Sequence, residues 1–428
     1  MHNEEMNLAW QFLEGTQISV FLTGKAGTGK TTFLRKLREL SPKRMVILAP
    51  TGVAAINACG QTIHSFFQLP FTPFIPGLRN ENKQRFFRMS KEKKDLIRSL
   101  DLLVIDEISM VRSDLLDAID DTLRRYRNPH KPFGGIQLLL IGDLQQLPPV
   151  VKDNEWTIMS QYYETPYFFS SIALKQLEYV TIELSHIYRQ QDSKFINILA
   201  AIRENRVSRE ILDELNKRCV TEKTDFDDNE WIRLTTHNAT ANSYNELRLA
   251  MLDEVPFTYK AKISGTFPEY SYPTDLSLTL KVGAQVMFVR NDTSTDKRYY
   301  NGRIGRVVSI SNNVITVRCN KETGEGTDTI VVKPEQWENI KFSIDETTKE
   351  ITEEVEGTFT QYPLRLAWAI TVHKSQGLTF SHAVLDINKS FAPGQAYVAL
   401  SRCRTLEGLI LSSPITERTV ITDFDVIH

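Results

Sequence analysis

Gly24-Lys25-Ala26-Gly27-Thr28-Gly29-Lys30-Thr31 follows an apolar run at residues 20–23 and precedes a helical pattern. The octapeptide matches GxxxxGK(S/T) in full, in the strand–loop–helix context that the pattern requires. Its glycines let backbone N–H groups converge on phosphate oxygens at a helix N-terminus, while Lys30 reaches the β- and γ-phosphates. We therefore expect a phosphate cradle made by Gly24, Gly27, Thr28, Gly29, Lys30, Thr31 and Thr32, with Thr31 as a Mg²⁺ ligand.

A second apolar run, residues 102–105, ends in two adjacent carboxylates, Asp106 and Glu107. At a strand tip beside a phosphate cradle, Asp106 is placed to hold Mg²⁺ through water. Glu107 is then placed to orient and deprotonate the attacking water. The weaker alternative is an acidic cap for a helix that starts at Ser109. The two motifs together predict hydrolysis of a nucleoside triphosphate, with ATP and Mg²⁺ as cofactors.

The remaining pattern predicts an α/β fold. Apolar runs at 20–23, 45–49, 102–105 and 138–141, separated by helical stretches, are typical of parallel strands buried on both faces. Helical periodicity returns at 185–255. Between about 256 and 362 the period becomes two with Gly turns, which indicates a small antiparallel β module inserted into the α/β body. The α/β pattern then resumes.

Composition limits the class of protein. The chain has 428 residues, 41% hydrophobic and 24% charged, which is enough apolar material for two or three domains. Its 51 Lys and Arg against 53 Asp and Glu give no overall basic footprint for nucleic acid. We expect no membrane span, no signal or transit peptide and a cytoplasmic, prokaryotic location. Scattered cysteines predict reduced packing residues and no zinc: Cys59, Cys219, Cys319 and Cys403.

Further motifs follow the first strands and recur near the end of the chain. They are residues 49–55 (APTGVAA), 62–65 (TIHS), 142–150 (GDLQQLPPV), 371–379 (TVHKSQGLT) and 397–404 (YVALSRCR). In order and spacing they resemble motifs Ia, Ib, III, V and VI of superfamily 1B helicases, and specifically the petite-integration-frequency (Pif) family, with RecD-type enzymes next. Residues 107–111 with 132–137 resemble a stretch that sets Pif helicases apart. The resemblance covers essentially the whole chain.

The resemblance implies an ATP-dependent, DNA-stimulated 5′-to-3′ DNA helicase with a monomeric core. Its partners would be single-stranded DNA and duplex or structured DNA, with G-quadruplexes left open, in repair, recombination or telomere-like maintenance. Two RecA-like P-loop domains are expected at 1–183 and at 184–255 plus 363–428. The β module at 256–362 would resemble a Src-homology-3-like domain.

By matching positions, Gln146 resembles the γ-phosphate sensor, Arg189 the motif IV arginine and Arg402 an arginine finger. We place Arg402 at a helix start and add Gly377 to the nucleotide contacts. Met6 stands where the family usually has an adenine-binding Gln. Small and polar side chains that would contact a DNA backbone without reading sequence complete the expected site: Pro50, Thr51, Thr62, His64, Phe67, Pro149, Val150, Thr236, His237, Asn238, His373, Lys374 and Ser375.

Residues 66–77 carry three prolines and four phenylalanines, and they directly follow the TIHS motif. Proline prevents a regular helix or central strand here. We expect a stiff protruding loop that wedges the duplex apart, the alternative being that its phenylalanines cover the core. The basic stretch from Lys83 to Lys94 is expected to be a solvated helix face, and acidic residues 345–356 an exposed hairpin.

Two other functions use the same first motifs. An RNA helicase or a bare translocase would share the fold, and a strand-displacement assay on DNA, RNA and hybrid duplexes separates them. A P-loop switch or clamp that binds nucleic acid without moving would hydrolyse slowly and ignore single strands. The full set of later motifs argues against a clamp.

Overall fold

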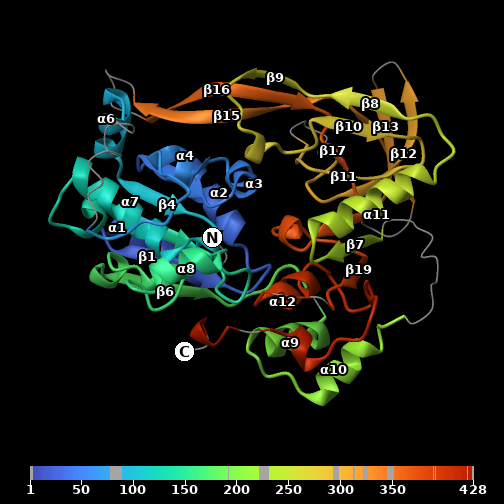
Figure 1. Ribbon diagram of the computed structural model, residues 1–428, viewed down its shortest axis with the longest axis horizontal. Helices are drawn as coiled ribbons and strands as arrows, with labels where there is room; N and C mark the ends of the chain where they lie inside the picture. Colours follow the sequence, from blue (N-terminus) through green and yellow to red (C-terminus); the bar gives the residue numbers. More distant parts are fainter. Residues whose placement is uncertain are drawn as a thin grey trace.

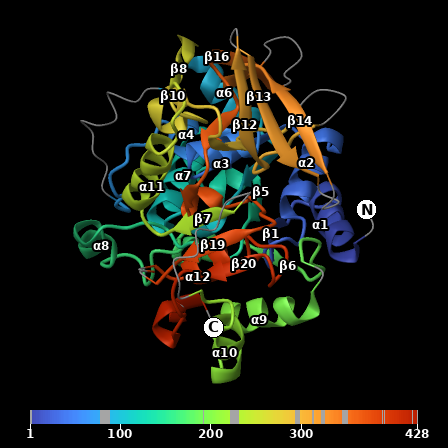
Figure 2. The same ribbon diagram turned by 90° about the vertical axis from the view of Figure 1, so that its right-hand side faces the viewer.

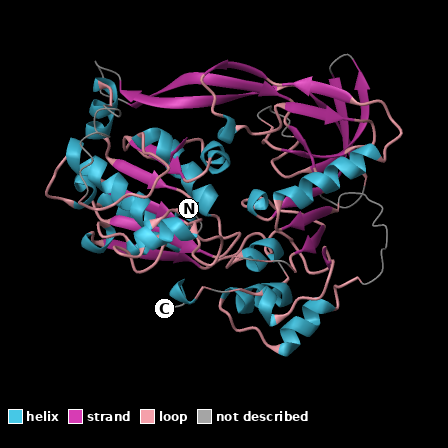
Figure 3. Ribbon diagram, viewed as in Figure 1, coloured by secondary structure: helices cyan, strands magenta, loops and turns pink. Residues whose placement is uncertain are grey.

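The computed structural model describes residues 3–77, 89–190, 192–220, 231–292, 298–311, 314–321, 326–344, 351–388, 390, 392–421 and 423–426. The chain forms two α/β lobes side by side, with a β-rich module above the second lobe (Figure 1). Figure 3 shows helices around the strands of each lobe and almost none in the module. Among the described residues, no helix has the length and apolarity needed to cross a membrane.

The first lobe is built on a six-stranded sheet of order β3-β2-β4-β5-β1-β6, in which every neighbouring pair is parallel. Its strands are β1 (Ser19–Gly24), β2 (Met45–Ala49), β3 (Gln61–Thr62), β4 (Leu102–Ile105), β5 (Gln137–Ile141) and β6 (Tyr179–Leu184). The four apolar runs of the sequence are confirmed as β1, β2, β4 and β5. Its helices are α1 (Glu4–Gly15), α2 (Lys30–Leu40), α3 (Gly52–Asn57), α4 (Ile63–Phe67), α6 (Lys91–Ser99), α7 (Ser113–Tyr126) and α8 (Asp153–Met159).

Both faces of this sheet are buried, which explains why its strands are apolar throughout. Alternate side chains of β4 enter two different cores, with Leu103 packed in one and Val104 in the other. Parallel order puts the carboxyl ends of β1, β4 and β5 at one edge. The phosphate-cradle, Asp106–Glu107 and Asp143–Gln146 segments therefore emerge next to one another, as ligand sites do in open α/β sheets.

The second lobe has a four-stranded parallel sheet of order β18-β7-β19-β20. Its strands are β7 (Ile232–Thr235), β18 (Ala369–Thr371), β19 (Ala383–Asp386) and β20 (Leu409–Leu411). Its helices are α9 (Ser193–Arg203), α10 (Arg209–Asn216), α11 (Asn238–Ala250) and α12 (Gln395–Leu400). Seen from the second lobe, α9 and α10 lie beneath the sheet and α11 beside the module (Figure 2). Ala26 and Leu147 of the first lobe pack into this core.

The module confirms the expected antiparallel texture. Its main sheet has order β14-β13-β12-β11-β17, and the alternating burial of β13 shows the predicted period of two. Strand β17 (Leu364–Leu366) pairs with β11, just past the expected boundary at 362. The other strands are β8 (Phe257–Lys260), β9 (Lys262–Gly265), β10 (Ser277–Leu280), β11 (Gln285–Phe288), β12 (Ile304–Ser311), β13 (Val314–Asn320), β14 (Thr327–Val332), β15 (Glu335–Ile344) and β16 (Ile351–Gln361).

The long hairpin β15–β16 reaches from the module across the first lobe to α6 (Figure 1). Gln61 of β3 donates through its side-chain amide to the backbone oxygen of Ile340 in β15, and Ile340 packs on the first lobe's core. The acidic segment at 345–356 is partly confirmed as a hairpin, because its residues 351–356 belong to β16 and pair antiparallel with β15. Residues 345–350 lie outside the described residues.

The expectation for residues 66–77 is wrong at its start. Phe66 and Phe67 end helix α4 and are fully buried in the first lobe's core, so they cannot belong to a protruding tip. The irregular loop begins only after Gln68, whose φ of 53° ends the helix. Phe71 at its centre is 70% exposed, as a wedge would require. The alternative, cover for the core, therefore holds for the two phenylalanines that open the segment.

The basic stretch also differs from its expectation. Lys93 is buried, and its ammonium lies 3.5 Å from the centre of the Phe66 ring, a cation–π contact that covers the core. Lys91 and Lys94 are on the same helix, α6, and the N-terminal half of the stretch (Lys83, Arg85 and Arg88) lies outside the described residues. A solvated face thus describes only part of this helix.

We predict that Phe66→Ala lowers the free energy of unfolding by about 3–5 kcal/mol, because it leaves a cavity in a close-packed core. Phe71→Ala is the matched control, and an exposed site should change that free energy by about 0.5 kcal/mol or less. Denaturant unfolding of both variants measures the difference. Equal effects at the two positions would contradict the division of the segment into a buried helix end and an exposed loop.

Candidate nucleotide and nucleic-acid site

The phosphate cradle joins β1 to α2 through a loop that only glycine can shape. Gly24, Gly27 and Gly29 have φ values of 145°, 83° and 93°, in the region that side chains disfavour. At Gly27 a Cβ would lie 2.4 Å from Cβ of Arg189, so this glycine also lets the chain at Arg189 pack directly on the loop. Gly29 is the N-cap of α2, which points its free N–H groups into the loop.

Lys30 folds back on its own loop. Its ammonium donates to the backbone oxygen of Gly24 at 2.5 Å and to that of Lys25 at 3.1 Å. Burial lowers the pKa of Lys30, and the charges of Asp143 and Glu107 oppose that effect. An ammonium held on neutral carbonyls in a poorly hydrated place is well suited to exchange them for phosphate oxygens. Thr31 and Thr32 are exposed at the start of α2.

The two predicted carboxylates lie where the sequence placed them, directly after β4. Burial raises the pKa of Asp106 to about 6. Burial and the neighbouring charge of Asp106 raise the pKa of Glu107 to about 7. Glu107 has a φ of 51°, a conformation uncommon for a non-glycine residue. The strained backbone turns its side chain across the cleft, where one oxygen accepts a 2.9 Å hydrogen bond from the side-chain amide of Gln376.

Two arginines of the second part of the chain reach this cleft. Arg189 donates to the backbone oxygen of Ser401 at 3.2 Å, and burial followed by the charge of Arg402 lowers its pKa to about 9. Arg402 is fully buried and donates to the backbone oxygens of Val398, Ser375 and Leu378. Burial lowers its pKa as well. Two guanidiniums close together on neutral acceptors form a site that favours an anion.

The expected setting of Arg402 is wrong in one respect. It lies after the C-terminal end of α12, not at a helix start, and its guanidinium caps the carbonyl of Val398 in the last turn of that helix. Cations are stabilised at helix C-termini, where carbonyl groups have no partner inside the helix. The change from apolar to polar residues before Arg402 marks the end of a helix. From the sequence alone it could equally be taken for a helix start.

Gln146 lies on the same edge of the first sheet and is mostly buried. Its side-chain amide donates to Asp143 at 3.1 Å. Met6, which the resemblance put at the expected adenine-binding position, contacts the cradle, since a Cβ on Gly29 would lie 2.7 Å from its methyl carbon. Tyr188, which is half exposed, also lies beside Gly29, with a ring carbon 3.6 Å from where that Cβ would be. Gly377 is exposed, one residue past Gln376.

The DNA-facing expectations fall into two groups. Pro50, Thr51, His64, Phe67 and Val150 line one groove of about 970 Å³ in the first lobe, together with the loop around Phe71. The ring of Phe71 stacks on His64 at 4.5 Å between centroids, and burial lowers the pKa of His64. Phe67 contributes to this groove from the core. Thr62 and Pro149 are buried and lie outside the lining. Thr62 accepts a hydrogen bond from the Ser65 N–H as the cap of α4.

The second group lies at the start of α11 and in the 3-10 turn η6 (His373–Ser375). His237, Asn238 and Lys374 are exposed there, and burial lowers the pKa of His373. Thr236 is buried beside His237. The Ser375 side chain is 0% exposed and donates to the backbone oxygen of Val372, so its hydroxyl is engaged inside the protein. Burial excludes the Ser375 side chain as a DNA contact in this arrangement.

Four residues of the cleft were missed by the sequence reasoning as functional groups. Gln376 and Tyr397 lie inside the motifs at 371–379 and 397–404 but were given no role. Their polar side chains within these motifs could have marked them as candidates for the cleft. Arg203 ends an ordinary amphipathic helix, and nothing in its neighbours marks it. Asp143 was quoted only as part of GDLQQLPPV. The structure brings all four to the lobe interface.

The fold and this cleft define a class of protein: a P-loop nucleoside triphosphatase with two RecA-like lobes and the nucleotide site between them. Comparison with known proteins narrows the class. The model of the PIF1-like helicase family matches residues 10–212. ATP-dependent DNA helicase Pif1 of Bdellovibrio bacteriovorus is 35% identical over 421 residues, covering 96% of this chain and 87% of the relative. Human ATP-dependent DNA helicase PIF1 is 35% identical, covering 91% of this chain and 58% of the human protein.

Solved structures agree with these relatives. Pif1 from Bacteroides sp. in complex with ADP-AlF4 is 44% identical, with a TM-score of 0.91 over 100% of this chain and 96% of that chain. Bacteroides Pif1 bound to single-stranded DNA is 42% identical and has a TM-score of 0.70, covering 100% of this chain and 96% of that one. The chain belongs to the PIF1-like helicase family.

We predict that Glu107→Gln and Lys30→Ala separate chemistry from binding. Glutamine at 107 keeps the shape and can still accept from Gln376, but it cannot take a proton. We expect kcat to fall about 10²-fold or more with nucleotide affinity retained. Lys30→Ala removes a positive charge from the cradle, so affinity should fall along with turnover. Nucleotide titration and steady-state hydrolysis measure both. Near-normal turnover of Glu107→Gln would remove that residue from the mechanism.

Proposed function

We propose that this chain is an ATP-dependent helicase that moves 5′-to-3′ on single-stranded DNA and unwinds duplex or structured DNA. The observation that carries the proposal is the hydrogen bond between Gln376 of the second lobe and Glu107 of the first. It ties the group placed to activate water to a segment whose preceding residues, His373 and Lys374, face the proposed DNA side. Hydrolysis and strand binding would then share one element.

ATP is proposed to lie between the lobes with its phosphates on the 24–32 loop. Lys30 would exchange its two carbonyl acceptors for phosphate oxygens, and Gln146 would contact the terminal phosphate. Arg402 approaches from the other lobe, and Arg189 lies against Gly27 of the cradle. Both would stabilise charge on the transferring phosphoryl group once the lobes close. Glu107 would hold the attacking water and accept its proton.

Asp106 and Thr31 fit a Mg²⁺ ion. The donors are a carboxylate and a hydroxyl, the oxygen ligands that Mg²⁺ prefers. Burial raises the pKa of Asp106, which means that the site disfavours a negative charge in the absence of a nearby cation. When bound, the ion would supply neutralisation of phosphate charge. The protein's own part is to hold Asp106 at the strand tip, where its backbone N–H donates to Leu48.

Single-stranded DNA is proposed to cross the groove of the first lobe and the start of α11 with η6. The accessible members of the expected set are Pro50, Thr51, His64, Val150, His237, Asn238, His373 and Lys374. Polar side chains and backbone amides of this kind contact phosphates without reading sequence. Phe71 is the exposed aromatic residue beside them and would stack on a base. This tip, not the whole of 66–77, is the proposed wedge.

We keep the domain boundaries expected from the sequence as a proposal, with one change. The second part of the second lobe begins after β17 and not at residue 363. A bacterial cytoplasm, where ATP and single-stranded DNA are both present, is the proposed compartment. The names of the relatives favour DNA over RNA as the substrate. One chain supplies all the residues of the cleft, which supports a monomer as the working unit. A clamp that does not move would not need both arginines and Gln376 at the phosphate site.

We expect strand displacement only from duplexes that carry a 5′ single-stranded DNA tail, because a strand-tracking motor engages one polarity. The assay compares fluorescent DNA duplexes with 5′ tails, 3′ tails and 5′ RNA tails of equal length, in the presence of ATP. Lys30→Ala is the control for unwinding without a motor. Displacement from the 3′ tail alone would contradict the direction, and equal displacement from RNA tails would favour an RNA or mixed-substrate helicase.

A further inference from the structure

A buried ion pair joins the lobes beside the nucleotide cleft. Arg203, the last residue of α9 in the second lobe, donates to one oxygen of Asp143 from Nη2 at 3.2 Å and from Nε at 3.4 Å. The Asp143 side chain is 0% exposed and that of Arg203 is 13% exposed. A forked guanidinium on a carboxylate is directional, and breaking such a buried pair from one side leaves an uncompensated charge. The pair therefore fixes the orientation of the Asp143 carboxylate.

That carboxylate is shared with Gln146. The oxygen that accepts from Arg203 also accepts from the Gln145 N–H at 3.2 Å. The other oxygen accepts from the Gln146 side-chain amide at 3.1 Å. Turning the carboxylate would thus turn the amide of Gln146, which is the side chain proposed to contact the terminal phosphate. Arg203 has been given no role in the proposed hydrolysis so far. Its guanidinium donates to Asp143 and not to the phosphate cradle.

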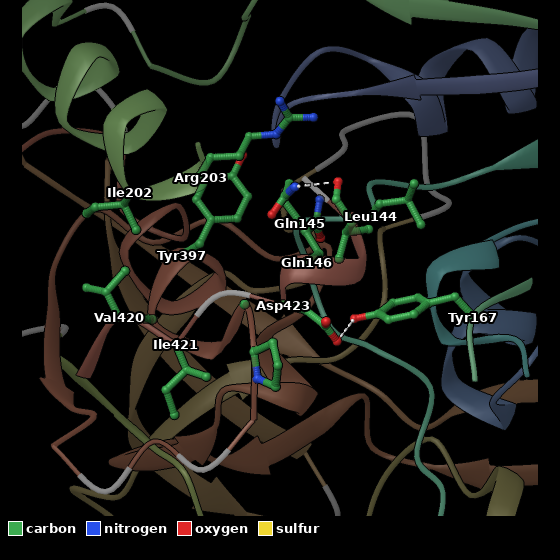
Figure 4. Close-up of a pocket in the computed structure, with 14 residues that line it drawn as sticks. Leu144, Gln145, Gln146, Tyr167, Ile202, Arg203, Tyr397, Val420, Ile421 and Asp423 are labelled. Carbon is green, nitrogen blue, oxygen red and sulfur yellow. Dashed lines mark hydrogen bonds between the residues drawn. The ribbon is translucent and has the colours of Figure 1, made fainter. Parts of the chain in front are cut away.

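Helix α12 holds the same region from the second lobe. A Cβ on Gly394, the N-cap of α12, would lie 2.1 Å from the backbone oxygen of Gln146, so the helix start packs directly on that residue. Farther along α12, the buried hydroxyl of Tyr397 accepts from the Ala26 N–H in the cradle at 3.1 Å. Figure 4 shows Tyr397 beside Arg203, with Gln145 and Gln146 next to them. The backbone and side chain of Gln146 are both set by contacts to the second lobe.

We propose that Arg203 is a positioning residue for hydrolysis: it holds Asp143 so that Asp143 orients the Gln146 amide toward the terminal phosphate when the lobes are together. The inference rests on the proposed function. It makes the Gln146 contact conditional on the position of the second lobe, through a group that never touches the nucleotide. A lobe that moves away carries Arg203 with it and frees the Asp143 carboxylate to turn.

A double-mutant cycle tests this chain of contacts. We expect Arg203→Gln to lower kcat for ATP at saturating single-stranded DNA by about tenfold, with a smaller change in KM, because the loss is in orientation and not in binding. Gln146→Ala should lower kcat as well. In the Gln146→Ala background, adding Arg203→Gln should change kcat by about twofold or less, because the residue on which Arg203 acts is gone. A purely structural role for Arg203 would lower kcat by the same factor in both backgrounds.

Two further variants keep the test decisive. Glu183→Gln removes the other, exposed partner of Arg203, 3.6 Å away, and should leave kcat within about twofold of the unmodified protein. Arg203→Lys keeps the buried positive charge, so it can replace Arg203→Gln in the cycle if that variant does not fold. It should lower kcat less than Arg203→Gln does, and it should leave kcat unchanged in the Gln146→Ala background. Equal losses in the two backgrounds for either Arg203 variant, or a normal kcat for Gln146→Ala, would overturn the proposal. An unmodified protein without DNA-dependent hydrolysis would instead contradict the proposed function.

Discussion

Burial of charge from both lobes in one cleft is the constraint on which the rest of the structure depends. Lys30 and Arg402 rest on neutral carbonyls, while Asp106 and Glu107 have raised pKa values. Each of these charges is costly in a poorly hydrated place unless an opposite charge joins it. Phosphate oxygens with a divalent cation would satisfy both sets together. Because Arg402 belongs to the second lobe, and Arg189 donates to the backbone oxygen of Ser401 in that lobe, the full gain requires the lobes to meet, which links nucleotide binding to closure.

The segment 371–378 carries that link to the proposed DNA side. Within it, Lys374 is exposed, the backbone oxygen of Ser375 accepts from Arg402, and Gln376 donates to Glu107. Three consecutive residues thus lie at the proposed DNA side, on Arg402 and on Glu107, the carboxylate proposed to activate water. A small shift of this turn on binding a strand would move Arg402 and Glu107, two of the groups proposed to act in hydrolysis. Coupling of this kind needs no long pathway, because a single packed element touches both sites.

The sequence predicted the sheet edge well, because its signals are local. A complete phosphate-loop pattern between a strand and a helix, followed by two carboxylates at a strand tip, specifies the fold of that edge and brings the residues of the proposed chemistry together there. Strands β3 and β6 gave weaker signals, since one is two residues long and the other alternates in burial at the sheet's edge. Contacts such as Arg203 with Asp143 or Gln376 with Glu107 join positions far apart in the chain, and no local pattern encodes them. Phe66 and Phe67 show that a local pattern can also mislead. An apolar run beside prolines does not reveal which of its aromatic side chains are buried.

The rate of ATP hydrolysis with and without single-stranded DNA tests most directly whether strand binding and chemistry share one cleft. The measurement uses the whole chain with Mg²⁺ and saturating ATP, and a homopolymeric oligonucleotide that cannot form a duplex. We expect stimulation of about tenfold or more, a size typical of coupling between two sites. A rate that is unchanged although the oligonucleotide is bound would contradict it.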